Sequence, residues 1–211
     1  NVVSFNNAIQ IVEKRGRLMQ AAVPVGEGVM AAILGMDDAS VISICRSASD
    51  NDSVSAVNFN APGQVVIAGE TVGVQRAMEL AKNAGAKRAV LLPVSAPFHT
   101  NMMRPASELL GLELEKVRFS PPDIPVVHNL NADFENDPSK IRSIMLQQIY
   151  NPVKWVSCIA TLRALKVHTF IECGPGRVLS GLARKIDPIF ELFSSCDLRR
   201  FESALDALEK E

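Results

Sequence analysis

The spacing of hydrophobic and polar positions changes twice along the chain, and each change marks a different kind of structure. The first residues place apolar side chains at helical intervals behind Ser4, a good helix cap, so a helix is expected to run to about Ala22. Short apolar runs follow over residues 24–96. Beyond residue 97, helical patterns alternate with single strands. This last alternation favours an α/β protein with a parallel sheet.

The stretch 24–96 is predicted to form a compact subdomain. Its elements are expected in the order strand, helix, strand, strand, helix, strand, which is the split-βαβ or ferredoxin-like arrangement. A Pro-Gly turn within residues 61–64 joins two short strands and indicates a hairpin. The expected strands are Gly28–Leu34, Val54–Asn60, Val65–Ala68 and Ala89–Val94, and the expected helices are one capped by Asp37 and one over Val72–Ala84.

The stretch 97–211 is predicted to belong to a larger α/β domain, together with the helix in residues 1–23. Only about three strands are expected in it, whereas parallel sheets are usually larger and covered on both faces. We therefore expect strands of this domain to be missing at the N-terminus and the small subdomain to be inserted into it. The expected strands are Val126–Asn129, Thr169–Glu172 and Phe190–Ser194, and the helices Asn101–Val117, one ending near Tyr150, Val153–Leu165, Arg177–Lys185 and Phe201–Glu209.

Composition narrows the functional classes. The chain has 211 residues with 22 basic and 23 acidic side chains, a balance that argues against binding to duplex nucleic acid. No apolar run approaches the ~20 residues that a membrane helix needs. The cysteines have neither C-x-x-C nor zinc-finger spacing, so we expect reduced thiols, a cytoplasmic protein and no metal site. They are Cys45, Cys158, Cys173 and Cys196.

His99 is the first candidate for chemistry. It lies between an expected strand and an expected helix, where α/β folds often place catalytic groups. Histidine is the commonest general base, but a structural or merely exposed histidine fits the residues equally well. His128 and His168 flank expected strands and are interpreted as structural.

Arg15 and Asn60 carry polar side chains that a binding site could use. Arg15, near the end of the first helix, can hold a carboxylate bidentately, although arginines at helix ends are more often solvated surface residues. Asn60 lies at the hairpin, where turn chemistry is the ordinary explanation. A serine nucleophile on a strand-to-helix elbow would show the pattern G-x-S-x-G, and the 211 residues contain no such pentapeptide.

Six segments together resemble the malonyl-CoA:acyl-carrier-protein transacylases of fatty-acid synthesis. They cover nearly the whole chain in the family's order, and as a set they are far more specific than any one of them. The segments are EKRGRLMQ (13–20), GVMAAILG (28–35), VNFNAPGQVVIAG (57–69), GAKRAVLLPVSAPFHT (85–100), QQIYNPVKW (147–155) and ECGPGRVLSGL (172–182).

The resemblance implies an α/β-hydrolase-like large domain, incomplete here, with an inserted ferredoxin-like α+β subdomain. It also implies transfer of a malonyl group from malonyl-CoA to the phosphopantetheine thiol of acyl carrier protein through an acyl-serine. His99 matches the family's general base, and Gln148 matches the residue whose backbone carbonyl orients that histidine. Arg15 matches the arginine that binds the malonyl carboxylate. Phe98 resembles a pocket residue that excludes an α-methyl group, and Asn60 is assigned to the pocket wall.

The chain departs from the family at the nucleophile. The G-H-S-x-G elbow is expected just upstream of Asn1, and the segment that supplies part of the oxyanion hole further upstream, so the chain alone is expected to be inactive. Its C-terminal limit resembles that of a free-standing enzyme. The resemblance implies a monomer without a bound cofactor and an acidic carrier protein that docks on a basic surface such as Arg177, Arg184 and Lys185. Two alternatives are a non-catalytic protein that binds acyl carrier or coenzyme A, and an acyltransferase domain of a polyketide synthase.

Overall fold

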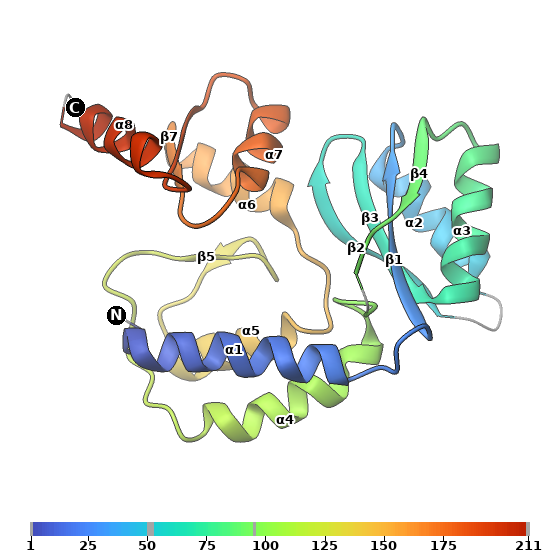
Figure 1. The fold of residues 1–211 in the computed structure, drawn as a ribbon, viewed down its shortest axis with the longest axis horizontal. Helices are drawn as coiled ribbons and strands as arrows, with labels where there is room; N and C mark the ends of the chain where they lie inside the picture. The colour runs from blue at the N-terminus through green and yellow to red at the C-terminus, as the bar shows by residue number, and fades with distance from the viewer. Residues whose placement is uncertain (1, 50–52, 95, 210–211) are drawn as a thin grey trace. The chain divides into compact units, whose positions relative to one another are not determined.

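The computed structural model describes residues 2–49, 53–94 and 96–209 and has a mixed α/β architecture (Figure 1). It divides into two compact units, Asn1–Trp155 and Val156–Glu211. The predicted ranges 1–23 and 97–211 include residues 1, 210 and 211, which lie outside the described residues. Unit 1 contains α1 (Phe5–Ala21), β1 (Gly28–Leu34), α2 (Asp38–Ala48), β2 (Val54–Ala61), β3 (Gln64–Glu70), α3 (Thr71–Asn83), β4 (Arg88–Leu91), η1 (Asn101–Met103), α4 (Arg104–Leu114), β5 (Val127–His128), β6 (Asp133–Phe134) and α5 (Pro138–Gln147).

A four-stranded antiparallel sheet organises residues 28–91 of unit 1. Its strand order is β2-β3-β1-β4, so β1 pairs with β3 on one side and β4 on the other. The helices α2 and α3 cover one face, where Ile33 and Ile67 of the sheet share a core with Val41 and Val74 of the helices (Figure 1). A smaller cluster that includes Met30 and Val66 lies on the other face.

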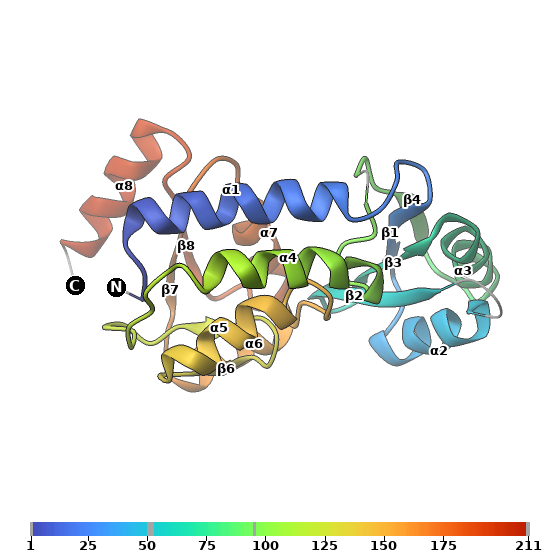
Figure 2. The same ribbon diagram turned by 90° about the horizontal axis from the view of Figure 1, so that it is seen from below.

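Three helices form the other half of unit 1. Ser4 caps α1 as expected, since its side chain accepts a hydrogen bond from the Asn7 backbone N–H at 3.2 Å. The helices α1 and α4 lie side by side, and a core with α5 forms around Ile11, Met103 and Leu110 (Figure 2).

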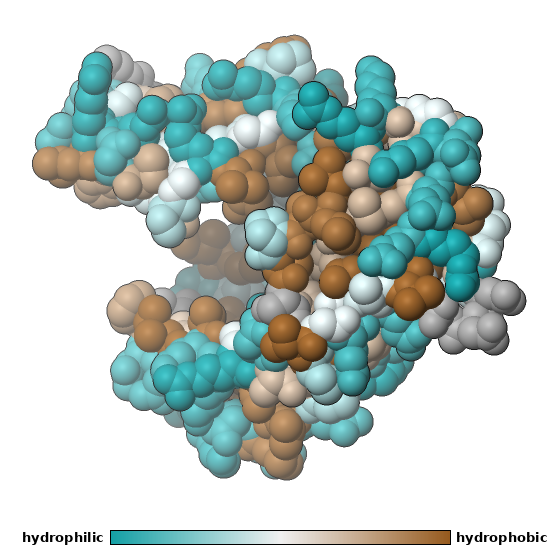
Figure 3. All heavy atoms as spheres, turned by 45° about the vertical axis from the view of Figure 1, so that its right-hand side comes forward, coloured by the Kyte–Doolittle hydropathy of each residue, from teal (hydrophilic) through white to brown (hydrophobic). Residues whose placement is uncertain are grey.

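Several apolar side chains of α1 face solvent. Phe5, Ile9 and Val12, which follow one stripe of the helix, are 82%, 55% and 66% exposed. Figure 3 shows hydrophobic residues also reaching the surface at several places on one face of the molecule. Exposed apolar stripes of this kind usually mark surfaces that pack against further polypeptide.

Unit 2 is built on a parallel strand pair. The strands β7 and β8 run in register from Thr169 opposite Glu191 to Glu172 opposite Ser194. The Glu172 carboxylate accepts hydrogen bonds from the backbone N–H groups of Leu179 and Ser180 and thereby caps α7. The elements are α6 (Trp155–Ala164), β7 (Thr169–Glu172), α7 (Val178–Ile186), β8 (Glu191–Ser194) and α8 (Leu198–Leu208).

Two expectations about strands were wrong. The strand expected to reach Val94 ends at Leu91, because Pro93 has no N–H to extend the ladder. The strand expected near residue 127 does not join a three-stranded parallel sheet in the described part of the chain. It forms a short antiparallel hairpin with β6, across a turn in which Ala132 has φ 59°. The sequence carried no signal for β6 because each strand has only two residues.

All four cysteines are free thiols. Among the described residues, no helix combines the length and the apolar character that crossing a membrane requires.

Candidate active site

A strained turn presents His99 at the end of the segment that follows β4. His99 has φ 65°, a left-handed conformation that costs a non-glycine residue roughly 1–2 kcal/mol. The preceding Pro97 is buried, and its carbonyl accepts a hydrogen bond from the Thr100 hydroxyl at 2.8 Å. These contacts hold the backbone in its strained conformation at His99, whose side chain is half-buried.

Pro97 is fixed in turn by the start of β1. A Cβ atom at Gly28 would overlap the Pro97 ring, so only glycine allows this approach. The sheet and the histidine turn are therefore in direct contact at Gly28.

We expect Gly28→Ala to destabilise the chain by about 1–3 kcal/mol, because the proline ring has to move. Gly16→Ala is the matched control: nothing lies within 4 Å of a Cβ there, and alanine in a helix interior stabilises by about 0.5–1 kcal/mol. Urea unfolding of both variants measures the difference. Equal effects of the two substitutions would contradict the close contact.

The end of α5 supplies the partner of His99. The imidazole Nδ1 lies 2.9 Å from the backbone carbonyl oxygen of Gln148, which directly follows α5. A carbonyl can only accept, so Nδ1 carries the proton and Nε2 of the neutral ring carries a lone pair. The ring is thus held as a base with Nε2 free to act.

Arg15 brings a cation to the same place. It lies on α1, half-buried, and burial lowers the pKa of its guanidinium. Its charge is close enough to His99 to lower the pKa of the imidazole. None of the ion pairs between described residues involves Arg15, whereas its neighbour Arg17 pairs with Glu13. A half-buried guanidinium without an acidic partner is suited to bind the carboxylate of a ligand.

The two remaining predicted site residues, Phe98 and Asn60, have different surroundings. Phe98 is half-buried and packs against both the helical core and the cluster on the open face of the sheet. Asn60 is half-buried on β2 at an irregularity in the pairing with β3. Within the described residues, no hydrogen bond joins Asn60 to His99 or Arg15. The structure therefore brings His99, Gln148 and Arg15 together, and Phe98 directly precedes His99 in the chain. Among the described residues, Asn60 is not joined to this group by a hydrogen bond.

Comparisons with known proteins show the family of this chain. The sequence profile described as the acyl transferase domain matches residues 1–185. The chain belongs to the acyl transferase domain family. It is 48% identical over 185 residues to the malonyl CoA-acyl carrier protein transacylase of Salmonella typhimurium, which covers 88% of this chain. The chain spans only 60% of that relative's length.

Solved structures of the family superpose on the whole chain. The malonyl CoA-acyl carrier protein transacylase from Coxiella burnetii matches with a TM-score of 0.95 and 38% identity, over 100% of this chain and 66% of that one. A malonyl-transacylase in complex with a type II PKS acyl-carrier protein matches with a TM-score of 0.94 and 42% identity, over 98% and 67% of the two chains.

In this member of the acyl transferase domain family, four groups or effects shift the pKa of His99. Burial lowers the pKa of His99 most, and the charge of Arg15 lowers it further. The backbone carbonyls of Gln148 and Asn151 act in the opposite direction, because they favour the protonated ring. The net result is a pKa below the ordinary value of about 6.5, which keeps the imidazole neutral and basic at neutral pH.

We expect an NMR titration of the 211-residue chain to place the pKa of His99 below the ordinary histidine value of about 6.5, because the ring is buried. The unfolded chain then binds the proton more readily than the folded one. The stability linked to neutral His99 is therefore present above about pH 6.5 and is lost as pH falls through the folded pKa. A His99 pKa at or above about 6.5 would contradict the effect of burial on the ring.

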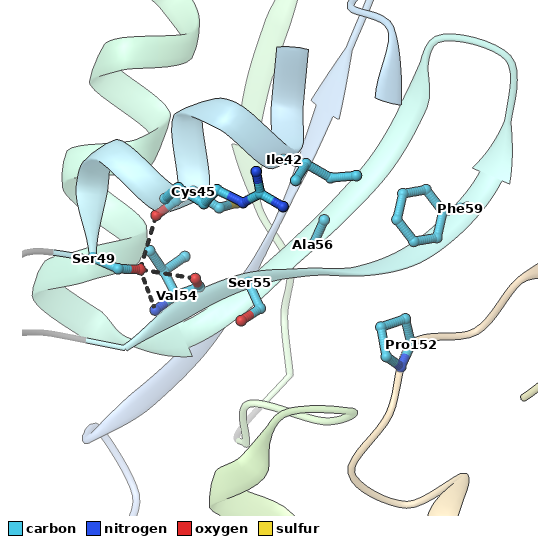
Figure 4. A pocket seen from close by; sticks show the side chains of 9 residues that line it. Ile42, Cys45, Ser49, Val54, Ser55, Ala56, Phe59 and Pro152 are labelled. Atoms are coloured by element: carbon cyan, nitrogen blue, oxygen red, sulfur yellow. Dashed lines mark hydrogen bonds between the residues drawn. The ribbon is translucent and has the colours of Figure 1, made fainter. Parts of the chain in front are cut away.

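A separate pocket of about 500 Å³ does not contribute to this site. Figure 4 shows its lining side chains coming from α2, from β2 and, at Pro152, from the chain after α5. Its lining is mostly apolar, and the Ser49 hydroxyl is already bonded to the backbone of Cys45 and Val54. Burial raises the pKa of Cys45 to about 12, so this thiol is not a nucleophile.

Sequence reasoning did not single out Asn151. Its backbone carbonyl faces His99, and its side chain bonds to the end of α5. The available signal was an asparagine directly before a proline at a helix end, which indicates a turn with special hydrogen bonding.

Proposed function

We propose that this chain supplies the general base and the carboxylate-binding arginine for malonyl transfer from malonyl-CoA to the phosphopantetheine thiol of acyl carrier protein, in fatty-acid biosynthesis. The observation that carries the proposal is the position of Arg15. A guanidinium that has no acidic partner among the described residues lies near a histidine whose Nδ1 bonds to a backbone carbonyl. A base beside a carboxylate-binding cation suits an acyl group that ends in a carboxylate.

In the proposed reaction, Nε2 of His99 takes the proton of a serine hydroxyl as its oxygen attacks the malonyl thioester. The tetrahedral intermediate collapses, the C–S bond breaks, and the imidazolium returns the proton to the coenzyme A sulfur. In the second half the carrier thiol gives its proton to Nε2 and attacks the acyl-serine. The serine oxygen then leaves with that proton. The Gln148 carbonyl stabilises each imidazolium through Nδ1.

We propose that the serine lies outside these 211 residues, since no G-x-S-x-G occurs within them. On this view residues 1–23 and 97–211 belong to an α/β-hydrolase-like domain, and residues 24–96 form a ferredoxin-like insert. The exposed stripe of Phe5, Ile9 and Val12 supports the proposal, because an α/β domain needs polypeptide against that face of α1.

The proposed function also assigns roles to Phe98 and Asn60 and a docking surface for the carrier protein. Phe98 would exclude an α-methyl group from the acyl pocket, and Asn60 would contribute to its wall. An acidic carrier would dock on unit 2, where Arg177 and Arg184 line one groove beside Gly181 and Lys185 lies on the same helix. The enzyme would act as a cytoplasmic monomer, with the phosphopantetheine carried by its partner and no metal or bound cofactor of its own.

The decisive experiment compares the isolated chain with a chimaera. In the chimaera, the part of the Salmonella typhimurium relative that this chain does not span is joined to the 211 residues. We expect no malonyl transfer by the isolated chain, and malonyl transfer with a malonyl-serine detectable by mass spectrometry in the chimaera. Transfer by the isolated chain would overturn the proposal that the nucleophilic serine lies outside these 211 residues. A folded chimaera that does not transfer malonyl groups would overturn the proposed malonyl-transfer function.

Two other readings make different predictions in this assay. A non-catalytic protein would bind acyl carrier or coenzyme A without transfer in either form. A polyketide acyltransferase would transfer malonyl groups to a polyketide carrier faster than to a fatty-acid carrier. The match to the malonyl-transacylase bound to a type II PKS acyl-carrier protein favours including such a carrier in the assay.

A further inference from the structure

The backbone carbonyls at the end of α5 accept hydrogen bonds from different groups. The Leu146 carbonyl accepts hydrogen bonds from the Ile149 N–H and from the Ser107 hydroxyl, which lies 2.9 Å away. The Gln147 carbonyl accepts from the Tyr150 N–H and, at 2.8 Å, from the side-chain amide of Asn151. The Gln148 carbonyl is left to face His99. The last carbonyls of a helix have no partner within the helix, and here side chains and the backbone N–H groups of the next turn bind them.

Asn151 closes the turn that carries the Gln148 carbonyl. Because Pro152 follows, Asn151 is biased away from helical conformation and the chain must leave α5 here. Its side chain nevertheless reaches back four residues to Gln147, so it ties the departing chain to the helix end. Gln148 lies inside the loop that this hydrogen bond closes.

The far side of the turn is anchored to the sheet. The Val153 N–H donates to the Val57 carbonyl at 2.8 Å, and the Phe59 N–H donates to the Val153 carbonyl at 3.0 Å. An irregularity in the pairing of β2 with β3 lies between Ala56 and Asn58, at the same point. It lets β2 bond to β3 on one edge and to Val153 on the other. The turn is therefore fixed at Gln147 and at Val153.

We propose that Asn151 is a positioning residue for His99: its side-chain hydrogen bond to the Gln147 carbonyl holds the Gln148 carbonyl against Nδ1 and thereby sets the tautomer of the ring. This rests on the proposed function, in which Nε2 must accept a proton. Without the Asn151 bond the turn keeps the Tyr150 N–H bond to the Gln147 carbonyl and the anchor at Val153, but the side-chain tie between Asn151 and the end of α5 is lost. The Gln148 carbonyl then loses its fixed distance to the ring. Nδ1 then loses its acceptor at 2.9 Å, and the proton can move to Nε2, where it blocks the base.

The tautomer can be measured directly in the 211-residue chain. The ¹⁵N chemical shifts of the imidazole distinguish Nδ1–H from Nε2–H, and the experiment runs above the pKa, where the ring is neutral. In the unmodified chain we expect Nδ1–H to dominate at His99. Asn151→Leu keeps a similar volume without a donor and should shift the population towards Nε2–H. Asn151→Asp keeps the shape, also lacks the donor when ionised, and should give the same shift.

Asn131→Leu is the matched control. Asn131 is an exposed turn residue whose side chain accepts a bond from the Asp133 N–H, far from the end of α5 in the sequence. The Asn131→Leu substitution should leave the His99 tautomer unchanged. Circular dichroism and thermal unfolding establish that each variant is folded, and the Tyr150 N–H still satisfies the Gln147 carbonyl in both Asn151 variants.

The inference is wrong if folded Asn151→Leu or Asn151→Asp keeps His99 in the Nδ1–H form. It is also wrong if Asn131→Leu produces the same change. In the active chimaera, both Asn151 variants should lower kcat more than they raise KM. A tautomer shift without any malonyl transfer in the unmodified chimaera would support the positioning role and reject the proposed function, so the two failures are distinguishable.

Discussion

Replacing His99 with asparagine is expected to lower malonyl transfer by the chimaera by about 10²- to 10⁴-fold, the usual contribution of a general acid–base residue. Asparagine suits this test because it tolerates the left-handed backbone that His99 adopts, and its amide can still donate to the Gln148 carbonyl. The variant therefore removes the proton acceptor while the turn is preserved. Malonyl transfer to carrier protein, followed by mass spectrometry, measures the loss.

His168→Asn is the control for this substitution. His168 is exposed and belongs to unit 2, so the same chemical change there should leave transfer within about twofold of the unmodified protein. If His99→Asn retained full activity while folding normally, His99 would not be the base. If the two variants lost activity equally, the effect would be general and the assignment of the base would fail.

Removing the Arg15 guanidinium is expected to change which acyl group is used. Arg15→Ala should lower kcat/KM for malonyl-CoA by about 10- to 150-fold, corresponding to about 1.5–3 kcal/mol for hydrogen bonds to a charged group. Acetyl-CoA has no carboxylate to lose this contact, so the acetyl-to-malonyl ratio should rise by a similar factor. Arg15→Lys should recover only part of the selectivity, because an ammonium cannot bind a carboxylate with two parallel bonds.

Arg17→Ala is the matched control two residues along the same helix. Arg17 is exposed and pairs with Glu13, so its loss should change neither the selectivity nor, beyond about 0.5 kcal/mol, the stability. Arg15→Ala should not destabilise the free protein either, because the half-buried guanidinium has no ion-pair partner among the described residues. An unchanged acetyl-to-malonyl ratio would show that Arg15 does not contact the substrate carboxylate.

Local signals located most helices and the central hairpin. Ser4 and Asp37 cap the helices α1 and α2 as their side chains predict, and the turn at Pro62 and Gly63 joins β2 to β3. These elements depend on interactions within a few residues, which the sequence displays directly. The β5–β6 hairpin and the end of β4 were not found, because very short strands have no periodicity to detect.

The candidate site could be assembled only in part from the residues. By itself, His99 fitted a structural role as well as a catalytic one, and Arg15 resembled an ordinary surface arginine. The resemblance to the transacylases grouped them with Gln148, Phe98 and Asn60. The roles of these residues stay predictions, although the structure places His99, Arg15 and Gln148 together.

By itself, the sequence determined the family, the order of most elements apart from the short strand β6 and the 3-10 helix η1, and the absence of a G-x-S-x-G nucleophile motif from these 211 residues. These follow from residue identity and from interactions between near neighbours. Only the tertiary structure decided that the Gln148 carbonyl meets Nδ1 of His99, that Asn151 closes the turn behind it, and that Arg15 lies close enough to act on the same ring. A backbone carbonyl has no side-chain signature, and its direction depends on where α5 ends against the sheet. The tautomer and basicity of His99 are consequently properties of the packed unit.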